Sequence, residues 1–296
     1  MSNIEIGLAG ILATASPIVV AVIGEIITER SGVINLSVNG IILISAMVGF
    51  WSALVTGNPL IGLAAGACVG MLIGAILAFT SITLKQSQVA VDFILALLLK
   101  DISYFLGTQL VSETGPTIGI LQLSKFVNIP VISPIFLNQS LLTYLSFGLI
   151  ILANYWLFQT RQGLFLRAAG EQQESARARG LHVNSIRYLY TIIGSGLVGL
   201  AGPMYSLSLK AGWKGSLSGL DGIGWIVLAI TIFGGWKPIR GAMGAYLFVF
   251  FQWIGLVFQS SLPQIPSQVF QVAPFPLMIL TLLFIDGKHK KASQYY

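Results

Sequence analysis

Charged side chains that could take part in chemistry lie inside apolar segments of this 296-residue sequence. Asp92, Lys100 and Asp101 interrupt the apolar run at 89–110, and Glu25 lies near the end of the first apolar run. A charge at the centre of a bilayer costs about 2.5–3.5 kcal/mol on insertion scales, so such groups face the protein interior or pair with one another. Lys100 lies two helical turns from Asp92 and can instead pair with a carboxylate on another segment, such as Glu25. These charges are therefore polar contacts along a substrate path, members of a structural ion pair, or residues beyond a span end that lies elsewhere than the apolar run indicates.

A polar interruption at 29–40, with the sequence ERSGVINLSVNG, separates the first two apolar segments. Helices broken at membrane depth are tolerated only where their backbone is buried in protein or lines a water-filled cavity. Broken helices also offer free amide and carbonyl groups to polar substrates. Asn35, Ser37 and Asn39 are therefore candidate substrate contacts. The alternative is an ordinary cytoplasmic turn between two membrane spans.

Two aromatic side chains, Trp225 and Phe233, lie in a later apolar segment. Aromatic faces stack favourably on flat rings such as nucleobases. The alternative is that these side chains anchor their helix at the membrane interface or pack within the bundle. The complete candidate substrate path comprises Glu25, Asn35, Ser37, Asn39, Asp92, Lys100, Asp101, Trp225 and Phe233.

The sequence has too few reactive side chains for an enzyme. It contains two histidines, His182 and His289, and one cysteine, Cys68, and both histidines lie outside the apolar segments. Those segments hold no convincing set of nucleophile, base or metal ligands, and the sequence has no Gly-rich phosphate-binding loop with its lysine. We therefore expect no catalytic residue, no metal site and no cofactor bound by this chain. If ATP drives this protein, another chain must bind it.

The composition is that of a membrane protein. Apolar residues make up 55% of the chain and charged residues 9%, against about 25% charged residues in soluble domains. A membrane-spanning helix needs about 20 apolar residues. The net charge of +6 is spread over loops between apolar segments, so it does not indicate nucleic-acid binding. The predicted fold is an all-α polytopic membrane protein with about nine transmembrane helices, near 6–27, 36–56, 60–80, 89–110, 140–158, 188–209, 223–236, 241–259 and 271–286.

Residues 159–187 form a long polar segment between apolar segments, and five of the seven arginines lie in it. By the positive-inside bias this loop is cytoplasmic, and an odd number of spans then places the N-terminus outside and the C-terminus inside. The run 171–179 consists mostly of good helix formers. Gly170 precedes the run and Gly180 follows it, where a C-terminal glycine stop is expected. Such a short helix can dock into a soluble partner, and the alternative is a solvated loop that only sets orientation.

Three stretches resemble the permeases of ATP-binding-cassette (ABC) importers for simple sugars, nucleosides and branched-chain amino acids. GEQQESARARGL at 170–181, before a span that ends GLVGLAG, is similar to their cytoplasmic coupling segment. ERSGVINLSVNG and GWIVLAITIFGGWKPIRGAMGA, at 29–40 and 224–245, are similar to signatures of nucleoside permeases, which basic-membrane-protein-type lipoproteins serve. The resemblance extends from about residue 20 to 285. The sequence departs from the family pattern at Asn39, where Glu is common, and at Asp92, Lys100 and Asp101, where neutral residues are more frequent.

The resemblance implies a single transmembrane permease domain over 1–296, multi-pass in the bacterial cell (inner) membrane. It implies import of a nucleoside by alternating access, driven by ATP and Mg on separate ATPase subunits, with riboflavin or a simple sugar as the alternative cargo. The implied partners are an ABC ATPase, a substrate-binding lipoprotein and a longer, non-identical second permease subunit. An ion-coupled secondary transporter, which would use the charges at 92–101, is the alternative from another class. The residues expected to couple to the ATPase are Arg167, Gly170, Glu171, Ala176, Arg179 and Gly180.

Overall fold

A computed structural model of the protein describes residues 3–111, 113–122, 133–209, 212–261, 269 and 276. The predicted span at 271–286, apart from residue 276, lies outside the described residues, and so does His289. Ten α-helices account for most of what is described: α1 (Asn3–Arg30), α2 (Val38–Thr56), α3 (Pro59–Ala78), α4 (Gln88–Leu106), α5 (Leu141–Gln159), α6 (Arg161–Glu171), α7 (Gln173–Ala178), α8 (Val183–Met204), α9 (Ile223–Phe233) and α10 (Pro238–Ser261).

Short elements extend or connect these helices. Three are π-helical turns, η1 (Phe79–Thr83), η4 (Ser133–Leu137) and η5 (Tyr205–Leu209), and two are 3-10 turns, η2 (Gly107–Leu110) and η6 (Gly215–Ser218). Two short strands, β1 (Ile120–Gln122) and β2 (Asn138–Ser140), pair antiparallel, with Ile120 opposite Ser140.

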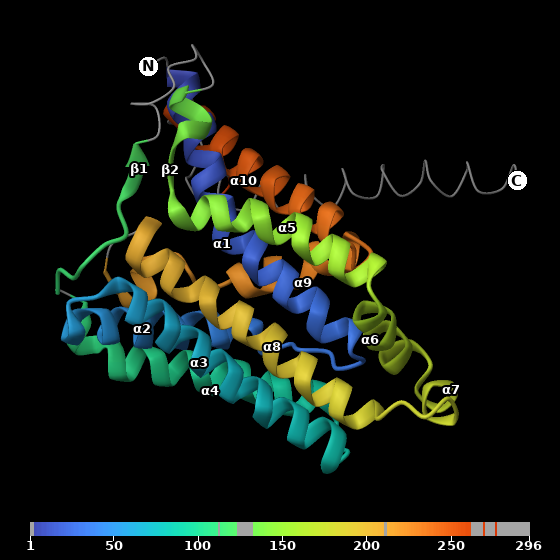
Figure 1. Ribbon diagram of the computed structural model, residues 1–296. Helices are drawn as coiled ribbons and strands as arrows, with labels where there is room; N and C mark the ends of the chain where they lie inside the picture. Colours follow the sequence, from blue (N-terminus) through green and yellow to red (C-terminus); the bar gives the residue numbers. More distant parts are fainter. Residues whose placement is uncertain are drawn as a thin grey trace, which may run out of the picture.

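The long helices run alongside one another between two distinct ends of the molecule (Figure 1). The β1–β2 pair and the start of α1 lie at one end, which we call the hairpin end, and α6 and α7 lie at the other, the α6–α7 end. Arg30 at the end of α1 contacts Glu171 of α6, so α1 runs from the hairpin end to the α6–α7 end. The short helix α9 packs against α1, α2 and α10.

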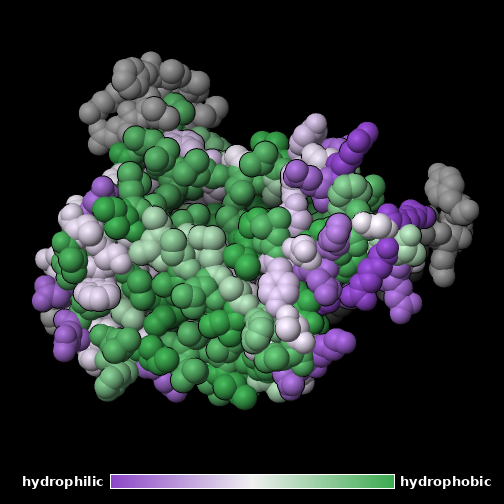
Figure 2. Space-filling model, turned by 60° about the horizontal axis from the view of Figure 1, so that its bottom comes forward, coloured by the Kyte–Doolittle hydropathy of each residue, from purple (hydrophilic) through white to green (hydrophobic). Residues whose placement is uncertain are grey.

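Six helical segments are long and apolar enough to cross a membrane: Glu5–Arg30, Val38–Thr56, Pro59–Thr83, Leu141–Gln159, Val183–Leu209 and Pro238–Gln259. Figure 2 shows a broad hydrophobic surface with hydrophilic residues gathered at its sides, as expected of a surface that lipid tails cover. The helix α4 has 19 residues but carries three charges, and α9 has 11 residues, so neither qualifies by length and composition. The chain is a polytopic helical membrane protein, and six of the nine predicted spans are supported within the described residues.

Small residues let α3 and α8 approach closely, as the glycine spacing at 62, 66, 70 and 74 predicts. A Cβ atom added at Gly70 would lie 2.3 Å from the backbone oxygen of Ser195 in α8. The same holds where α1 meets α8, because a Cβ at Gly24 would lie 2.5 Å from the oxygen of Gly194. Backbone thus packs on backbone, and any larger side chain must push the helices apart.

We expect Gly70→Leu to destabilise the protein, because overpacking a well-packed interior costs about 1–3 kcal/mol and backbone atoms cannot rotate away. The melting temperature of the purified variant in detergent should fall clearly below that of the wild type. Gly148→Leu on α5 is the matched control, since no atom of the described residues lies within 4 Å of a Cβ built there. Equal melting temperatures for the two variants would contradict this account of the packing.

Candidate functional site

The chain breaks between α1 and α2, and the break lies inside the bundle. Gly32 has a positive φ of 84°, which lets the backbone turn sharply. The chain then returns alongside α1, because Asn35 Nδ2 donates a hydrogen bond of 3.2 Å to Glu25 Oε2. Asn35, Ser37 and Asn39 are all buried. The polar stretch at 29–40 is therefore a buried interruption of the helices rather than a loop exposed to solvent.

Two buried acids hold the returning segment in place. Asp92 Oδ2 accepts a hydrogen bond of 3.0 Å from the backbone amide of Leu36, beside the Asn35–Glu25 contact. Asn35 Oδ1 accepts from the amide and the hydroxyl of Ser37, over 3.1 and 2.7 Å. Among the described residues, Glu25 Oε1 and Asp92 Oδ1 have no hydrogen-bond partner. These four residues, Glu25, Asn35, Ser37 and Asp92, form what we call the α1–α2 cluster, which fixes backbone rather than lining an open surface.

Asn39 joins the start of α2 to the start of α9. Its Oδ1 accepts hydrogen bonds from the amides of Gly222 and Gly224, over 2.9 and 3.2 Å. Its Nδ2 donates to Asp221 Oδ1 over 2.9 Å. The first amides of a helix have no partner within the helix, so the Asn39 side chain acts as a cap for α9 from another part of the chain. The structure thus gives Asn39, predicted as a substrate contact, hydrogen bonds that link the start of α2 to the start of α9.

Lys100 pairs with Asp221, not with Glu25 or Asp92 as the sequence had suggested. Lys100 Nζ lies 2.5 Å from Asp221 Oδ2, and the two side chains are 31% and 35% exposed. Lys100 Nζ also lies 5.9 Å from the ring centroid of Tyr104, one turn further along α4. We call Asn39, Lys100 and Asp221 the α9 cluster. Sequence reasoning missed Asp221, because it lies outside the apolar segments, between the predicted spans 188–209 and 223–236.

Three predicted path residues lie outside both clusters. Asp101 is exposed on α4, directly after Lys100. Trp225 and Phe233 are 41% and 40% exposed on α9. The structure therefore gathers six of the nine predicted path residues into the two clusters and leaves these three on the surface.

The arginine-rich segment forms two helices where one was predicted. The α6 helix ends at Glu171 and α7 begins at Gln173, because Gln172 adopts φ −138° and ψ 68° between them. The expected helix start at Gly170 is therefore wrong, and this glycine lies within α6. A Cβ there would lie 2.2 Å from the backbone oxygen of Arg30, so Gly170 permits close contact with α1. Gly180 has a positive φ of 82° two residues after α7, which confirms the predicted C-terminal stop.

A surface groove of about 440 Å³ runs between α6 and α7. Among its lining residues are Phe165, Arg167, Glu171, Ala176 and Arg179. Arg167 also stacks over the ring of Phe158, 5.2 Å from its centroid, and Ala176 is 3% exposed. The groove thus brings together four of the six residues predicted to couple to another subunit, with Ala176 as a buried packing residue at its base.

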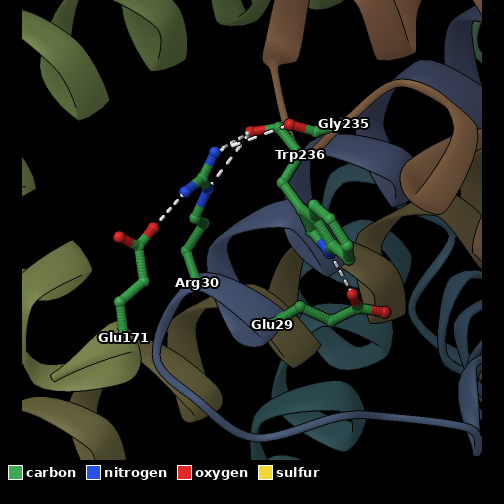
Figure 3. A network of polar contacts seen from close by, with 5 residues as sticks. All are labelled: Glu29, Arg30, Glu171, Gly235 and Trp236. Atoms are coloured by element: carbon green, nitrogen blue, oxygen red, sulfur yellow. Dashed lines mark hydrogen bonds and ion pairs between the residues drawn. The ribbon is translucent and has the colours of Figure 1, made fainter. Parts of the chain in front are cut away.

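Arg30 connects three elements at the α6–α7 end (Figure 3). Its Nη1 forms an ion pair with Glu171 Oε1 of α6. Its Nε and Nη2 donate to the backbone oxygen of Trp236, over 3.4 and 3.3 Å, and Nη2 also reaches the oxygen of Gly235 at 3.5 Å. Trp236 Nε1 in turn donates to Glu29. Sequence reasoning placed Glu29 and Arg30 in the polar interruption at 29–40 and predicted no contact for either side chain. The available signal was a pair of opposite charges two residues before Gly32.

Arg187 ties the same turn to α7 and α8. Its Nε and Nη2 donate to the backbone oxygens of Ser31 and Gly32, over 3.1 and 2.9 Å. Its Nη1 donates to Gln173 Oε1 in α7 over 3.3 Å. The turn after α1 is thus held from both sides, by Arg187 and by the contacts of Arg30. Arg187 had been counted in the sequence only as one of the orienting positive charges.

Comparison with known proteins assigns the chain to a family. The profile of the family described as branched-chain amino acid transport system / permease component matches residues 7–282. The chain is 35% identical over 242 residues, 79% of this chain and 72% of the relative, to the putative glucose ABC transporter permease protein TsgC13 of Haloferax volcanii. It is 30% identical over 302 residues, 97% and 94% of the two chains, to the nucleoside ABC transporter permease protein NupC of Lactococcus lactis.

A third relative is the guanosine ABC transporter permease protein NupQ of Bacillus subtilis, 29% identical over 293 residues, 94% of this chain and 91% of the relative. No solved structure is a significant match to this chain. Both polar clusters and the α6–α7 segment fall within the matched residues 7–282. The protein is therefore a non-enzymatic, multi-pass transport subunit of the cell membrane, and it belongs to the ABC transporter permease family described as branched-chain amino acid transport system / permease component.

Proposed function

We propose that this chain is the transmembrane subunit of an ABC importer that moves a nucleoside across the membrane by alternating access. The observation that supports a nucleoside is the match to NupC, which covers 97% of this chain at 30% identity. Family membership implies an ABC ATPase and a substrate-binding protein as partners. A second, non-identical permease subunit completes the proposed complex, in which residues 1–296 act as one permease domain and the ATPase alone binds ATP and Mg.

The substrate path runs along the face where Lys100 meets Asp221. Lys100 lies three turns into α4, about 18 Å from its first residue at 1.5 Å per residue, and so well within the length of this 19-residue helix. Both side chains of the pair are about one-third exposed in the isolated chain. Charge exposed to lipid at such depth costs about 2.5–3.5 kcal/mol. Water in a path, or the second permease subunit, must therefore cover this face.

Groups suited to a nucleoside lie along the same face. The exposed Lys100–Asp221 pair of the α9 cluster offers ammonium and carboxylate groups that can exchange hydrogen bonds with ribose hydroxyls and base edges. Trp225, exposed on α9 four residues beyond Asp221, offers an aromatic surface on which a base can stack. The path therefore combines polar contacts from α4 with a stacking surface from α9, and the buried α1–α2 cluster supports it from behind.

The α6–α7 end faces the cytoplasm in this proposal, because the arginines of 159–187 lie there and positive loops stay inside. With α4, α9 and the predicted segment 271–286 counted as further spans, the N-terminus is outside and the C-terminus inside. The groove between α6 and α7 then meets the ATPase, with Arg167, Glu171 and Arg179 at the contact.

Gly180→Leu should lower nucleoside uptake about five-fold, because a leucine at φ 82° strains the end of α7 by about 1–2 kcal/mol and tilts the docking surface. Gly57→Leu is the matched control. Gly57 also follows a helix end, with φ 68°, and like Gly180 has no atom of the described residues within 4 Å of an added Cβ, but it follows α2 rather than α7. Uptake and ATPase co-purification would be compared at equal membrane levels. Equal uptake by both variants would remove the coupling role from Gly180.

The proposed function is tested by co-expression with the ATPase, binding protein and second permease in cells that lack nucleoside uptake. We expect saturable uptake of labelled guanosine that disappears when the ATPase is inactivated and that excess riboflavin or glucose does not reduce. Uptake of glucose instead would overturn the assignment of a nucleoside as the cargo. Glucose is the specific alternative because the relative TsgC13 is described as a putative glucose permease. Uptake that persists with an inactive ATPase and follows a proton or sodium gradient would overturn the importer itself.

A further inference from the structure

Residues 29–32 end α1 and form the turn after it, and we call them the turn at 29–32. They lie between the proposed ATPase-docking segment and the turn that follows α9 (Figure 3). Arg30 supplies the direct contacts across this position, to Glu171 on one side and to the backbone oxygens of Gly235 and Trp236 on the other. Docking at α6 and α7 is thus linked to α9 through one side chain.

The chemistry of arginine suits this double contact. A guanidinium group presents five donors in a rigid plane, so it can hold a carboxylate and two carbonyl oxygens at once. A lysine at the same position would keep the charge but, with a single compact ammonium group, could not hold both partners in the same geometry. The side chain of Arg30 is 16% exposed, so the surrounding chain limits where its guanidinium can go.

Close packing makes α6 and the turn move together. A Cβ at Gly170 would lie 2.2 Å from the oxygen of Arg30 and 2.9 Å from the amide of Gly32, so no side chain separates the two backbones. Arg187 fastens the same turn to Gln173 of α7. A displacement of α6 and α7 cannot leave the turn at 29–32 where it was.

The short helix α9 is held at both ends by contacts with other parts of the chain. The amide of Trp236 donates to the oxygen of Thr231 over 3.2 Å, which makes the turn contacted by Arg30 part of the same hydrogen-bonded unit as α9. At its start, Asn39 caps the helix and binds Asp221, which pairs with Lys100. The 11 residues of α9 span about 16 Å between these contacts.

We infer that Arg30 is a positioning residue that transmits movement of the α6–α7 segment to α9, and through α9 to the Asn39–Asp221–Lys100 cluster. The inference rests on the proposed function, since it takes the groove between α6 and α7, which Arg161 does not line, as the docking site of the ATPase and the α9 cluster as part of the path. Arg30 touches neither ATP nor substrate. It determines how much substrate moves for each ATP hydrolysed.

The test uses the complete complex of both permeases, ATPase and binding protein in proteoliposomes, with guanosine as the ligand. For wild type, Arg30→Lys and Arg161→Lys, the guanosine transported and the phosphate released are measured together. Arg161 is exposed at the start of α6, and its side chain makes no hydrogen bond or ion pair within the described part of the chain, so Arg161→Lys is the matched control. We expect Arg30→Lys to lower the guanosine moved per ATP at least five-fold, while its ATP hydrolysis stays within two-fold of wild type and Arg161→Lys changes neither.

An unchanged ratio for Arg30→Lys would overturn the inference and leave the proposed function intact, whereas absence of ATP-driven guanosine transport by wild type would overturn the proposed function. A purely structural role would lower the yield of assembled complex or its melting temperature without changing the ratio. If the Arg30→Lys complex fails to assemble, the Trp236→Phe variant is tested instead. It removes the hydrogen bond from Nε1 to Glu29, which also connects the turn at 29–32 with the turn after α9. A lowered ratio for Trp236→Phe supports transmission between these turns, and a wild-type ratio rejects it.

Discussion

Lys100→Met should reduce guanosine uptake at least about ten-fold, which corresponds to about 1.4 kcal/mol. The substitution leaves Asp221 without its cation beside the start of α9. Removing one partner of a buried pair costs about 3–5 kcal/mol and surface pairs contribute about 0–1 kcal/mol. The one-third exposure of this pair places the expected loss between those ranges, at about 1–2 kcal/mol. Uptake is measured at equal membrane levels of the variant and the wild type.

The reversed pair distinguishes this ion pair from a loss of lysine packing. The double variant Lys100→Asp with Asp221→Lys should recover part of the lost uptake, because opposite charges again face each other across α4 and α9. Lys237→Met is the control, since Lys237 is exposed and its side chain has no hydrogen-bond or ion-pair partner among the described residues. Full uptake by Lys100→Met, or loss of uptake by Lys237→Met to the same extent, would contradict the assignment.

Asn39→Asp should have an effect of similar size for a different reason. Asn39 Nδ2 donates to Asp221 Oδ1 over 2.9 Å, so an aspartate would set two carboxylates against each other at hydrogen-bond distance. Like charges at this distance repel, and a buried donor–acceptor bond is lost at a cost of about 1–3 kcal/mol. Uptake should fall at least about ten-fold, and the melting temperature in detergent should fall as well.

Adding Asp221→Asn to Asn39→Asp exchanges the two side chains and restores the hydrogen bond in the opposite direction. The carboxylate introduced by Asn39→Asp still accepts from the amides of Gly222 and Gly224, as the Asn39 amide oxygen does. We expect the melting temperature to recover part of its loss and not all of it, because a neutral Asn at position 221 no longer forms the ion pair with Lys100. A double variant no better than Asn39→Asp alone would show that the α9 cap does not depend on this pair of side chains.

The sequence predicted the helices well and their interruptions less well. An apolar run of about 20 residues indicates a membrane span whatever the other segments of the chain do, so all six membrane-crossing segments were located from the sequence. The run 29–40 contains glycines, asparagines and charges that suit a solvated turn and a buried break equally. What makes the run a buried break is the pair of acids that bind it: Glu25 of α1 accepts from Asn35, and Asp92 of α4 accepts from the amide of Leu36. Hydropathy along one segment carries no information on such partners.

The candidate site could be predicted by residue type but not by pairing. Glu25, Asn35, Ser37, Asn39, Asp92 and Lys100 were marked as polar groups in apolar surroundings, and the structure gathers them into two clusters. Lys100 does pair with a carboxylate on another segment, as the sequence suggested, but the partner is Asp221 and not the example Glu25. Asp221 lies 121 residues further along the chain, and no spacing rule connects the two residues. The boundary between α6 and α7 was missed because Gln172 is compatible with a helix by residue type. Its backbone is non-helical in the structure, where it separates α6, which packs on Arg30, from α7, which Arg187 contacts through Gln173.

The most direct test of the proposed importer is transport by the purified four-component complex in proteoliposomes, with ATP on one side of the membrane and the binding protein with labelled guanosine on the other. We predict that guanosine accumulates on the side that holds ATP, that accumulation stops without ATP or without the binding protein, and that it falls at least about ten-fold in the Lys100→Met variant. Guanosine movement that is independent of ATP, or that follows an imposed ion gradient, would contradict the account.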